Sequence, residues 1–203
     1  MIMRKILFAL SLLIFAPNCF AQQTLKYPEL QKKLFTCNGG MFCALRDSAQ
    51  YFIYSLESLT QKEIFHKMIL ALNDSYVDFD KVVSKIENEA ITVNGYSLIK
   101  EPNVFTIGDE PNSLVYELIG INYRFSFKIK DGKMRVEAPY ISNVDYYFDT
   151  IHSKIRKSDS LTNLSSKSKS YTLDYIIEKT VASILQNIFK NMSLQLHGQN
   201  DDW

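Results

Sequence analysis

The segment Tyr123-Arg124-Phe125-Ser126-Phe127-Lys128-Ile129-Lys130 alternates strictly between apolar and polar side chains. This period of two predicts a β-strand with one buried face and one face in water. Asp131-Gly132 follows, a dipeptide preferred in two-residue type I′ turns because both positions need positive φ. A returning alternation then covers Met134, Val136, Ala138 and Tyr140. The stretch 123–140 therefore predicts a long antiparallel hairpin.

Further elements are predicted on the N-terminal side of this hairpin. The stretch 51–56 has the aromatic and β-branched content of a strand. Thr60-Gln61-Lys62-Glu63 matches a capping box, in which the Thr hydroxyl and the Glu carboxylate satisfy free amides at a helix start. Two short strands, 82–86 and 90–93, are expected next, before Asn94-Gly95. The predicted helix has one buried stripe, consisting of Ile64, Phe65, Met68, Ile69 and Leu72.

The C-terminal part predicts a linker and a long helix. Residues 157–170 are mostly Ser, Lys and Asn with only two leucines, a composition typical of a flexible linker. Residues 171–203 then form an amphipathic helix and a tail, because apolar residues from Leu173 to Met192 fall on one helical face. We expect this helix to pack on the sheet of its own domain. A partner-binding or membrane-surface helix is the alternative, disfavoured because the polar face is not strongly basic.

The element order resembles that of the DUF4468 family, secreted Bacteroidetes proteins described as having a fold like the TATA-binding protein. The resemblance rests on Tyr51-Phe52-Ile53-Tyr54 leading to the Thr60 helix, the hairpin from Lys85 to Gly95, residues 123–140 and the closing Asp201-Asp202-Trp203. It implies an α+β, TBP-like domain over residues 46–156, in the order β-α-β-β-β-β-α, with one curved antiparallel sheet covered by two helices. It implies no activity, and the nucleic-acid role of the namesake is not transferred, because function belongs to sites and not to folds.

Residues 1–21 read as a secretory signal peptide. Arg4 and Lys5 precede an apolar run from Ile6 to Ala16, and cleavage is expected after Ala21. The run is shorter than the roughly 20 apolar residues that span a bilayer. A lipid anchor at Cys19 is the less favoured alternative, because Pro17 and Asn18 precede it. We therefore expect a periplasmic or secreted product.

The charge balance disfavours nucleic acid as a partner. The chain has 23 basic and 22 acidic residues, and removal of Arg4 and Lys5 leaves 21 and 22, a net charge of 21 − 22 = −1 with neutral histidines. Such a chain has no long-range field that attracts phosphates or anionic membranes.

Cys37 and Cys43 lie in the lead-in segment 22–45 and are predicted to form a structural disulfide. Two cysteines this close in the sequence, with two glycines between them, are typical of a structural disulfide in an oxidising compartment. A catalytic dithiol is the alternative, but the usual Cys-x-x-Cys spacing is absent from the sequence.

No catalytic, metal or cofactor motif is found in the sequence. His66, His152 and His197 lack metal-ligand spacing, and the sequence contains neither a Gly-x-Ser-x-Gly elbow nor a phosphate-binding loop. We therefore predict a non-catalytic domain that binds a protein partner or a small apolar ligand. The enzyme alternative rests on Asp78 and Asp80, whose spacing suits an acid and a base and could also bind calcium. A solvated loop is the favoured interpretation.

Aromatic residues provide the candidate binding surfaces. Tyr146, Tyr147 and Phe148 are predicted to form an exposed patch, and Trp203 either docks on its own domain or is presented with Asp201 and Asp202 to an assembly partner. A further aromatic set is expected to be core, with a ligand pocket between sheet and helix as the alternative: Tyr123, Phe125, Phe127 and Tyr140.

Overall fold

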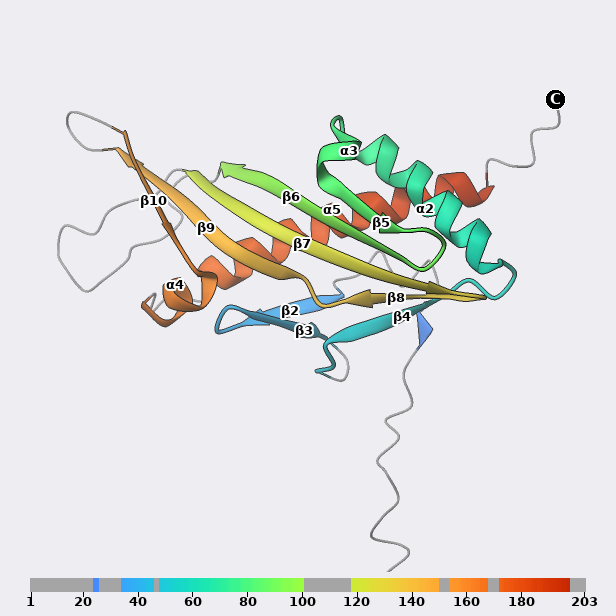
Figure 1. Cartoon of the computed structure of the whole chain (residues 1–203). Helices are drawn as coiled ribbons and strands as arrows, with labels where there is room; N and C mark the ends of the chain where they lie inside the picture. Colours follow the sequence, from blue (N-terminus) through green and yellow to red (C-terminus); the bar gives the residue numbers. More distant parts are fainter. Residues whose placement is uncertain are drawn as a thin grey trace, which may run out of the picture.

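The computed structural model describes residues 24–25, 34–45, 48–100, 118–149, 154–167 and 172–197. The signal segment, Cys19 and Trp203 lie outside these residues, so the predictions made on them remain predictions. The elements, shown in Figure 1, are β1 (Thr24–Leu25), β2 (Phe35–Asn38), β3 (Met41–Ala44), β4 (Tyr51–Ser55), α2 (Gln61–Ser75), α3 (Phe79–Val82), β5 (Val83–Ile86), β6 (Ala90–Lys100), β7 (Leu118–Lys130), β8 (Lys133–Glu137), β9 (Tyr140–Asp149), β10 (Lys154–Asp159), α4 (Leu161–Lys167) and α5 (Thr172–His197).

The long strand β7 organises an eight-stranded sheet. It pairs along one edge with β6, and along its other edge first with β8 and then with β9. β5 extends the sheet from β6, β4 from β8 and β10 from β9, all antiparallel, while β1 pairs parallel with β4. The predicted α+β class with an antiparallel sheet is confirmed. The structure adds β1, β9 and β10 to the predicted sheet, and it adds the separate β2–β3 hairpin.

The turn between β7 and β8 also positions helix α2. The tight turn is present, but it is not the predicted type I′, because Gly132 has a positive φ of +71° and Asp131 does not have a positive φ. The Asp131 Oδ1 atom accepts a hydrogen bond of 2.7 Å from the Gln61 amide at the start of α2. The predicted capping box is present, because Thr60 and Glu63 each accept the other's backbone N–H.

Helices α2 and α5 cover one face of the sheet and fill the space against it (Figure 1). The Phe189 ring of α5 lies edge-on to the rings of Tyr54 and Phe127, with centroid distances of 5.8 and 6.4 Å. Burial of each such side chain contributes about 1.5–3 kcal/mol. Ile119 and Ile121 of β7 are buried in addition to the four residues predicted from the alternation: Tyr123, Phe125, Phe127 and Ile129. The predicted C-terminal helix thus packs on its own domain.

Two register shifts change which face the residues of β9 occupy. Val136 pairs with Phe127, whereas Tyr140 pairs with Arg124, so the segment around Pro139 contains one residue more than the facing part of β7. This shift turns Tyr140 to the opposite face, where it is 58% exposed. A second shift, opposite Asn122/Tyr123, restores the original alternation further along β9.

Residues 157–167 are not a flexible linker, which corrects the prediction for 157–170. Lys157 to Asp159 belong to β10, and α4 follows. The Ser160 hydroxyl accepts the Asn163 amide, as an N-cap side chain does. The two leucines of this stretch, Leu161 and Leu164, are each only 1% exposed. Polar residues therefore start helix α4, and its two buried leucines pack it against the rest of the domain.

Cys37 and Cys43 are free thiols, so the predicted disulfide is wrong for this structure. Gly39 and Gly40 take φ values of +57° and +79° and join β2 to β3 by a two-residue turn. This turn pairs Cys37 with Phe42 and places Cys43 opposite Thr36. Because neighbouring strand residues point to opposite faces, the two thiols lie on opposite faces of the hairpin. A disulfide needs Cβ atoms that point toward each other.

In the described part of the chain, no helix is both long and apolar enough to cross a membrane.

Candidate functional site

The sheet face opposite α2 and α5, here called the open face, carries exposed aromatic and polar side chains. Alternation along β6 and β7 places Asn94, Tyr96, Asn122 and Arg124 on this face. Tyr96 is 47% exposed. Tyr140 reaches the same face through the register shift in β9. Large exposed aromatics on one face point to a contact surface.

An open pocket of about 330 Å³ lies here, within the size range of small-ligand sites. Tyrosines, amides, a hydroxyl and one charged side chain surround it. Its lining residues are Val82, Asn94, Gly95, Tyr96, Asn122, Tyr123, Arg124, Tyr140 and Ser142.

Arg124 lies in the middle of a row of three residues across the open face. Asn94 of β6 and Tyr140 of β9 are its two cross-strand partners. The Arg124 Nε–H donates a 2.9 Å hydrogen bond to Asn94 Oδ1. This is the only hydrogen bond of the Arg124 side chain among the described residues. The guanidinium is therefore oriented by Asn94 while both terminal nitrogens keep their donors.

Gly120 lets Tyr96 lie flat across β7. A Cβ atom at position 120 would be 2.1 Å from the Tyr96 hydroxyl and 2.6 Å from ring atom Cζ. Glycine is thus required for a close approach of the ring to the backbone. The Tyr96 ring is held against the sheet over Gly120, beyond Asn122 from Arg124, whereas Tyr140 is the direct cross-strand neighbour of Arg124.

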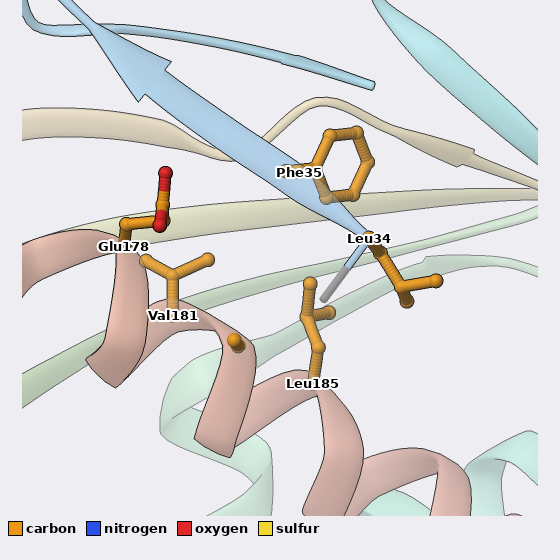
Figure 2. Close-up of a pocket in the computed structure, with 6 residues that line it drawn as sticks. Leu34, Phe35, Glu178, Val181 and Leu185 are labelled. Atoms are coloured by element: carbon orange, nitrogen blue, oxygen red, sulfur yellow. The ribbon is translucent and has the colours of Figure 1, made fainter. Parts of the chain in front are cut away.

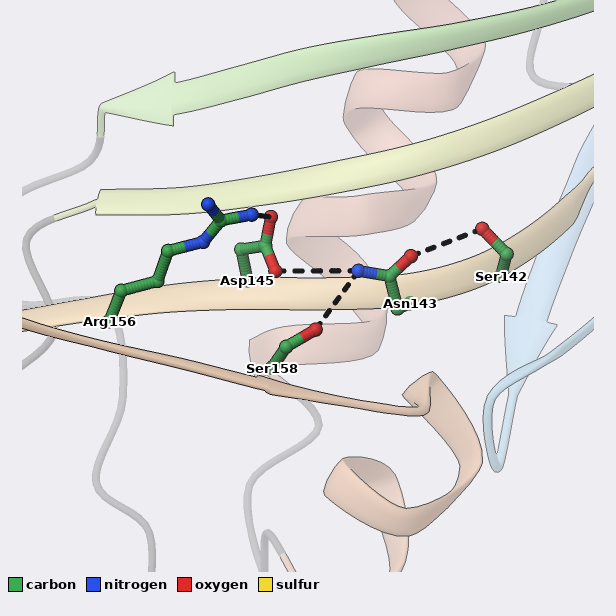
Figure 3. A network of polar contacts seen from close by, with 5 residues as sticks. All are labelled: Ser142, Asn143, Asp145, Arg156 and Ser158. Carbon is green, nitrogen blue, oxygen red and sulfur yellow. Dashed lines mark hydrogen bonds and ion pairs between the residues drawn. The ribbon is translucent and has the colours of Figure 1, made fainter.

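A polar network next to the pocket joins β9 to β10 (Figure 3). Asp145 is fully buried, and its Oδ2 atom is 2.5 Å from Arg156 Nη2. The Asn143 Nδ2 atom donates to Asp145 Oδ1 at 3.3 Å and to Ser158 Oγ at 3.0 Å. Ser142 Oγ donates to Asn143 Oδ1 at 3.2 Å, so the network ends at a pocket residue. Its hydrogen bonds hold the β9 side of the pocket in place.

Two acids of α5 hold the β2–β3 hairpin against the body of the domain. Glu178 Oε2 accepts bonds of 2.9 Å from the Cys37 N–H and the Thr36 hydroxyl. Asp174 Oδ2 accepts the Gly39 N–H at 3.1 Å. Burial, followed by the nearby Asp174 charge, raises the pKa of the Cys37 thiol to about 12. A thiol with such a pKa is chemically inert at neutral pH, so the structure disfavours a catalytic dithiol.

Figure 2 shows the residues that line a small gap between the hairpin and α5, which is too small for a ligand by its volume. Its volume of about 10 Å³ holds at most about one water molecule. Leu34 and Phe35 line it from β2 and the preceding residue, while Glu178, Val181 and Leu185 line it from α5. The alternative of a ligand pocket between sheet and helix is therefore not supported at this position.

Asp78 and Asp80 lie away from the pocket. Asp78 is the N-cap position of the short helix α3, and Asp80 is in its first turn. Both carboxylates are exposed, and Asp78 forms an ion pair of 3.1 Å with Lys81. Neither residue lines the pocket on the open face. The favoured interpretation, solvated carboxylates, describes their surroundings in the structure.

The predicted aromatic patch is wrong at Tyr146. Its side chain is only 8% exposed, because position 146 pairs with Ile119 on the helix-covered face. Tyr147 and Phe148 continue the backbone of β9, and their side chains lie outside the described residues. The Asp201-Asp202-Trp203 hypothesis also stays a prediction.

The sequence interpretation missed Tyr96, Asn122 and Arg124 as site residues. The strand expected to end at Val93 continues to Lys100, through Gly95. Gly95 stays in the strand because the Tyr123 ring occupies the place of its missing side chain. The only signal for these residues was the alternation of polar positions along β6 and β7. The same alternation occurs on any solvent-exposed face of a sheet, so it does not identify a site.

The fold and the pocket define an α+β domain with an open antiparallel sheet. No family model matches the chain, and no curated protein matches its sequence. Its structure is similar to that of a DUF4468 family protein from Bacteroides ovatus ATCC 8483, with 11% identity, a TM-score of 0.44, and coverage of 87% of this chain and 98% of that chain.

It is also similar to a TBP-like protein from Parabacteroides distasonis ATCC 8503, with 14% identity and a TM-score of 0.42. That likeness covers 68% of this chain and 90% of the other. Both neighbours are of the kind that the sequence resembles. Neither is named as an enzyme, and both likenesses concern the fold alone.

Proposed function

We propose that this chain is an exported, non-catalytic domain that binds a small ligand in the pocket on the open face. The observation that carries the proposal is the pocket itself, with an oriented Arg124 and two exposed tyrosines. The ligand differs from the apolar one expected from the sequence, because amide, hydroxyl and guanidinium groups line the walls. A few convergent polar groups in a concave site are typical of ligand recognition.

The construction of the pocket supports binding. Gly120 admits the Tyr96 ring, Asn94 orients Arg124, and the network through Asn143 supports Ser142. These side chains are held before any ligand arrives, which lowers the entropy cost of binding. Non-catalytic binding is favoured because the part of the lining that the structure describes contains neither a carboxylate nor a histidine that could act as general base.

A ligand screen by NMR on the purified chain tests the proposal. We expect binding ligands to shift the amide signals of Tyr96, Arg124 and Tyr140. Alanine at both Tyr96 and Tyr140 should weaken binding by about tenfold or more, because each ring provides a large contact area. The matched control is Tyr175→Ala on α5, which removes a tyrosine that is 61% exposed. Equal losses in the control and the double variant would refute the pocket as the site.

Export is tested separately from binding. N-terminal sequencing of the protein recovered outside the cytoplasm should begin at Gln22, as the signal pattern predicts. A chain that keeps Arg4 and Lys5, or one recovered with lipid on Cys19, would contradict the proposed processing.

A further inference from the structure

The cation that lines the pocket on the open face has no acidic partner among the described residues. Glu137 lies 3.1 Å from Lys128 and 3.0 Å from Arg135, and Asp145 is paired with Arg156. Arg124 forms no ion pair within the described residues. Among the described residues, it is also the only charged one that lines the pocket. The pocket therefore presents one positive charge that the described residues do not neutralise.

The donors of Arg124 are arranged for a planar acceptor. The Nε–H is used by Asn94, so the two terminal nitrogens remain for a ligand. A guanidinium binds a carboxylate through two parallel N–H···O bonds, and such charge-assisted pairs are stronger and more directional than neutral ones. The single guanidinium of Arg124 therefore matches a ligand with a single negative charge.

The side chains next to Arg124 suit the organic part of a ligand that carries this negative charge. Tyr140 is its direct cross-strand partner, and Tyr96 is opposite Asn122, the next residue on the same face of β7. Residues so placed lie about 5–8 Å apart, a distance that aromatic side chains bridge. Tyr140 provides apolar surface beside the guanidinium, the Tyr96 ring provides more where it lies over Gly120, and Asn122 between them adds an amide.

We propose that the ligand of this pocket is a small organic carboxylate, bound by the Arg124 fork with its ring or apolar body between Tyr96 and Tyr140. The inference rests on the proposed function and names its ligand class. An inorganic anion is disfavoured because it would leave both tyrosine rings without a contact. Phosphate has more charge and more acceptors than one arginine fork satisfies.

Matched pairs of compounds test the ligand class on the purified chain. We would titrate benzoate against benzamide, and glucuronate against glucose, and follow the amide signals of Arg124 and Tyr140. At least one carboxylate should bind about 10- to 100-fold more tightly than its neutral partner, as expected for a charge-assisted bond. Binding should also weaken as salt rises, because the charged group is exposed.

Substitutions at Arg124 separate charge from geometry. Arg124→Gln should abolish the preference for the carboxylate, and Arg124→Lys should keep only part of it, because lysine lacks the planar fork. Tyr175→Ala is the control that should leave the affinities unchanged. Both Arg124 variants should unfold at the denaturant concentration of the wild type, since the side chain is exposed.

The outcomes distinguish the inference from the function on which it rests. Equal affinity for each carboxylate and its neutral partner would overturn the inference and leave the binding pocket in place. Tighter binding of inorganic phosphate than of either carboxylate would overturn it as well. A failure of all these compounds and of the ligand screen to bind at about 10 mM would overturn the proposed function too.

Discussion

The ring of Tyr123 occupies the space that a side chain at Gly95 would need. A Cβ atom at position 95 would lie 2.3 Å from Cζ and from the hydroxyl oxygen of Tyr123. Tyr123 is 6% exposed, and its hydroxyl is 3.2 Å from that of Tyr76 at the end of α2. Gly95 thus allows β6 to continue as a strand, while the Tyr123 hydroxyl hydrogen-bonds with that of Tyr76 in the helix layer.

Gly95→Ala should therefore destabilise the domain by about 1–3 kcal/mol, because the buried Tyr123 ring cannot move without losing its packing. Denaturant unfolding measures the change. The matched control is Gly120→Ala, where the obstructing Tyr96 ring is 47% exposed and can swing into solvent. We expect that control to cost less than about 1 kcal/mol. Equal costs for the two variants would contradict this account.

Glu178→Ala should loosen the β2–β3 hairpin. It leaves the buried Cys37 N–H without the acceptor on α5, at a cost of about 1–3 kcal/mol. Glu178→Gln keeps an acceptor oxygen at the same place and should cost less. Amide exchange at Cys37 and Gly39 measures the local effect. If exchange at these two amides is unchanged in Glu178→Ala, then α5 does not hold the hairpin.

Arg156→Ala should leave the buried Asp145 carboxylate without its cation. The Arg156 side chain is 60% exposed, so water screens part of the loss, and we expect about 1–3 kcal/mol of destabilisation. The double variant Asp145→Asn with Arg156→Ala should be more stable than Arg156→Ala alone. A double-mutant cycle measures this coupling, and strict additivity would show that the pair does not interact.

The stability of the domain should fall in alkali. In the folded state burial raises the pKa of Cys37 from 9.0 to about 12, so only the unfolded state releases this proton between these values. Stability is then fully present below pH 9 and is lost by about 1.4 kcal/mol per pH unit above it. Burial also raises the pKa values of Tyr76 and Tyr123, which adds to the loss above pH 10.

Cys37→Ala isolates the cysteine contribution. Between pH 9 and 10 the variant should lose less stability per pH unit than the wild type, measured by denaturant unfolding at each pH. Identical slopes would show that Cys37 is not the titrating group. Cys43→Ala is the control, because this residue is only partly buried and lies on the other face of the hairpin.

Local patterns predicted the elements of the fold well. The alternation from Tyr123 to Val136 became β7 and β8, and the box at Thr60 and Glu63 starts α2. These signals are local, because a strand period or a helix cap depends on a few neighbouring residues. The predicted disulfide failed because spacing alone does not define which face of a hairpin each cysteine occupies.

The candidate site could not be predicted from the sequence, because its residues are brought together only by the register between strands. Asn94, Arg124 and Tyr140 come from three strands, and only their pairing brings them into one row. The extra residue near Pro139 turns Tyr140 outward, and no propensity signals that shift. The second shift, opposite Asn122/Tyr123, returns Tyr146 to the core instead of to an exposed patch.

The contact between α5 and the β2–β3 hairpin has a consequence for the order of folding. The hydrogen bonds of Thr36, Cys37 and Gly39 reach acids that follow them by 142, 141 and 135 positions. A two-stranded hairpin is marginal by itself, and contacts of such sequence separation form slowly. The strands β2 and β3 are synthesised early but become stable only after α5 has docked. Docking of α5 therefore completes the folding of both ends of the domain together.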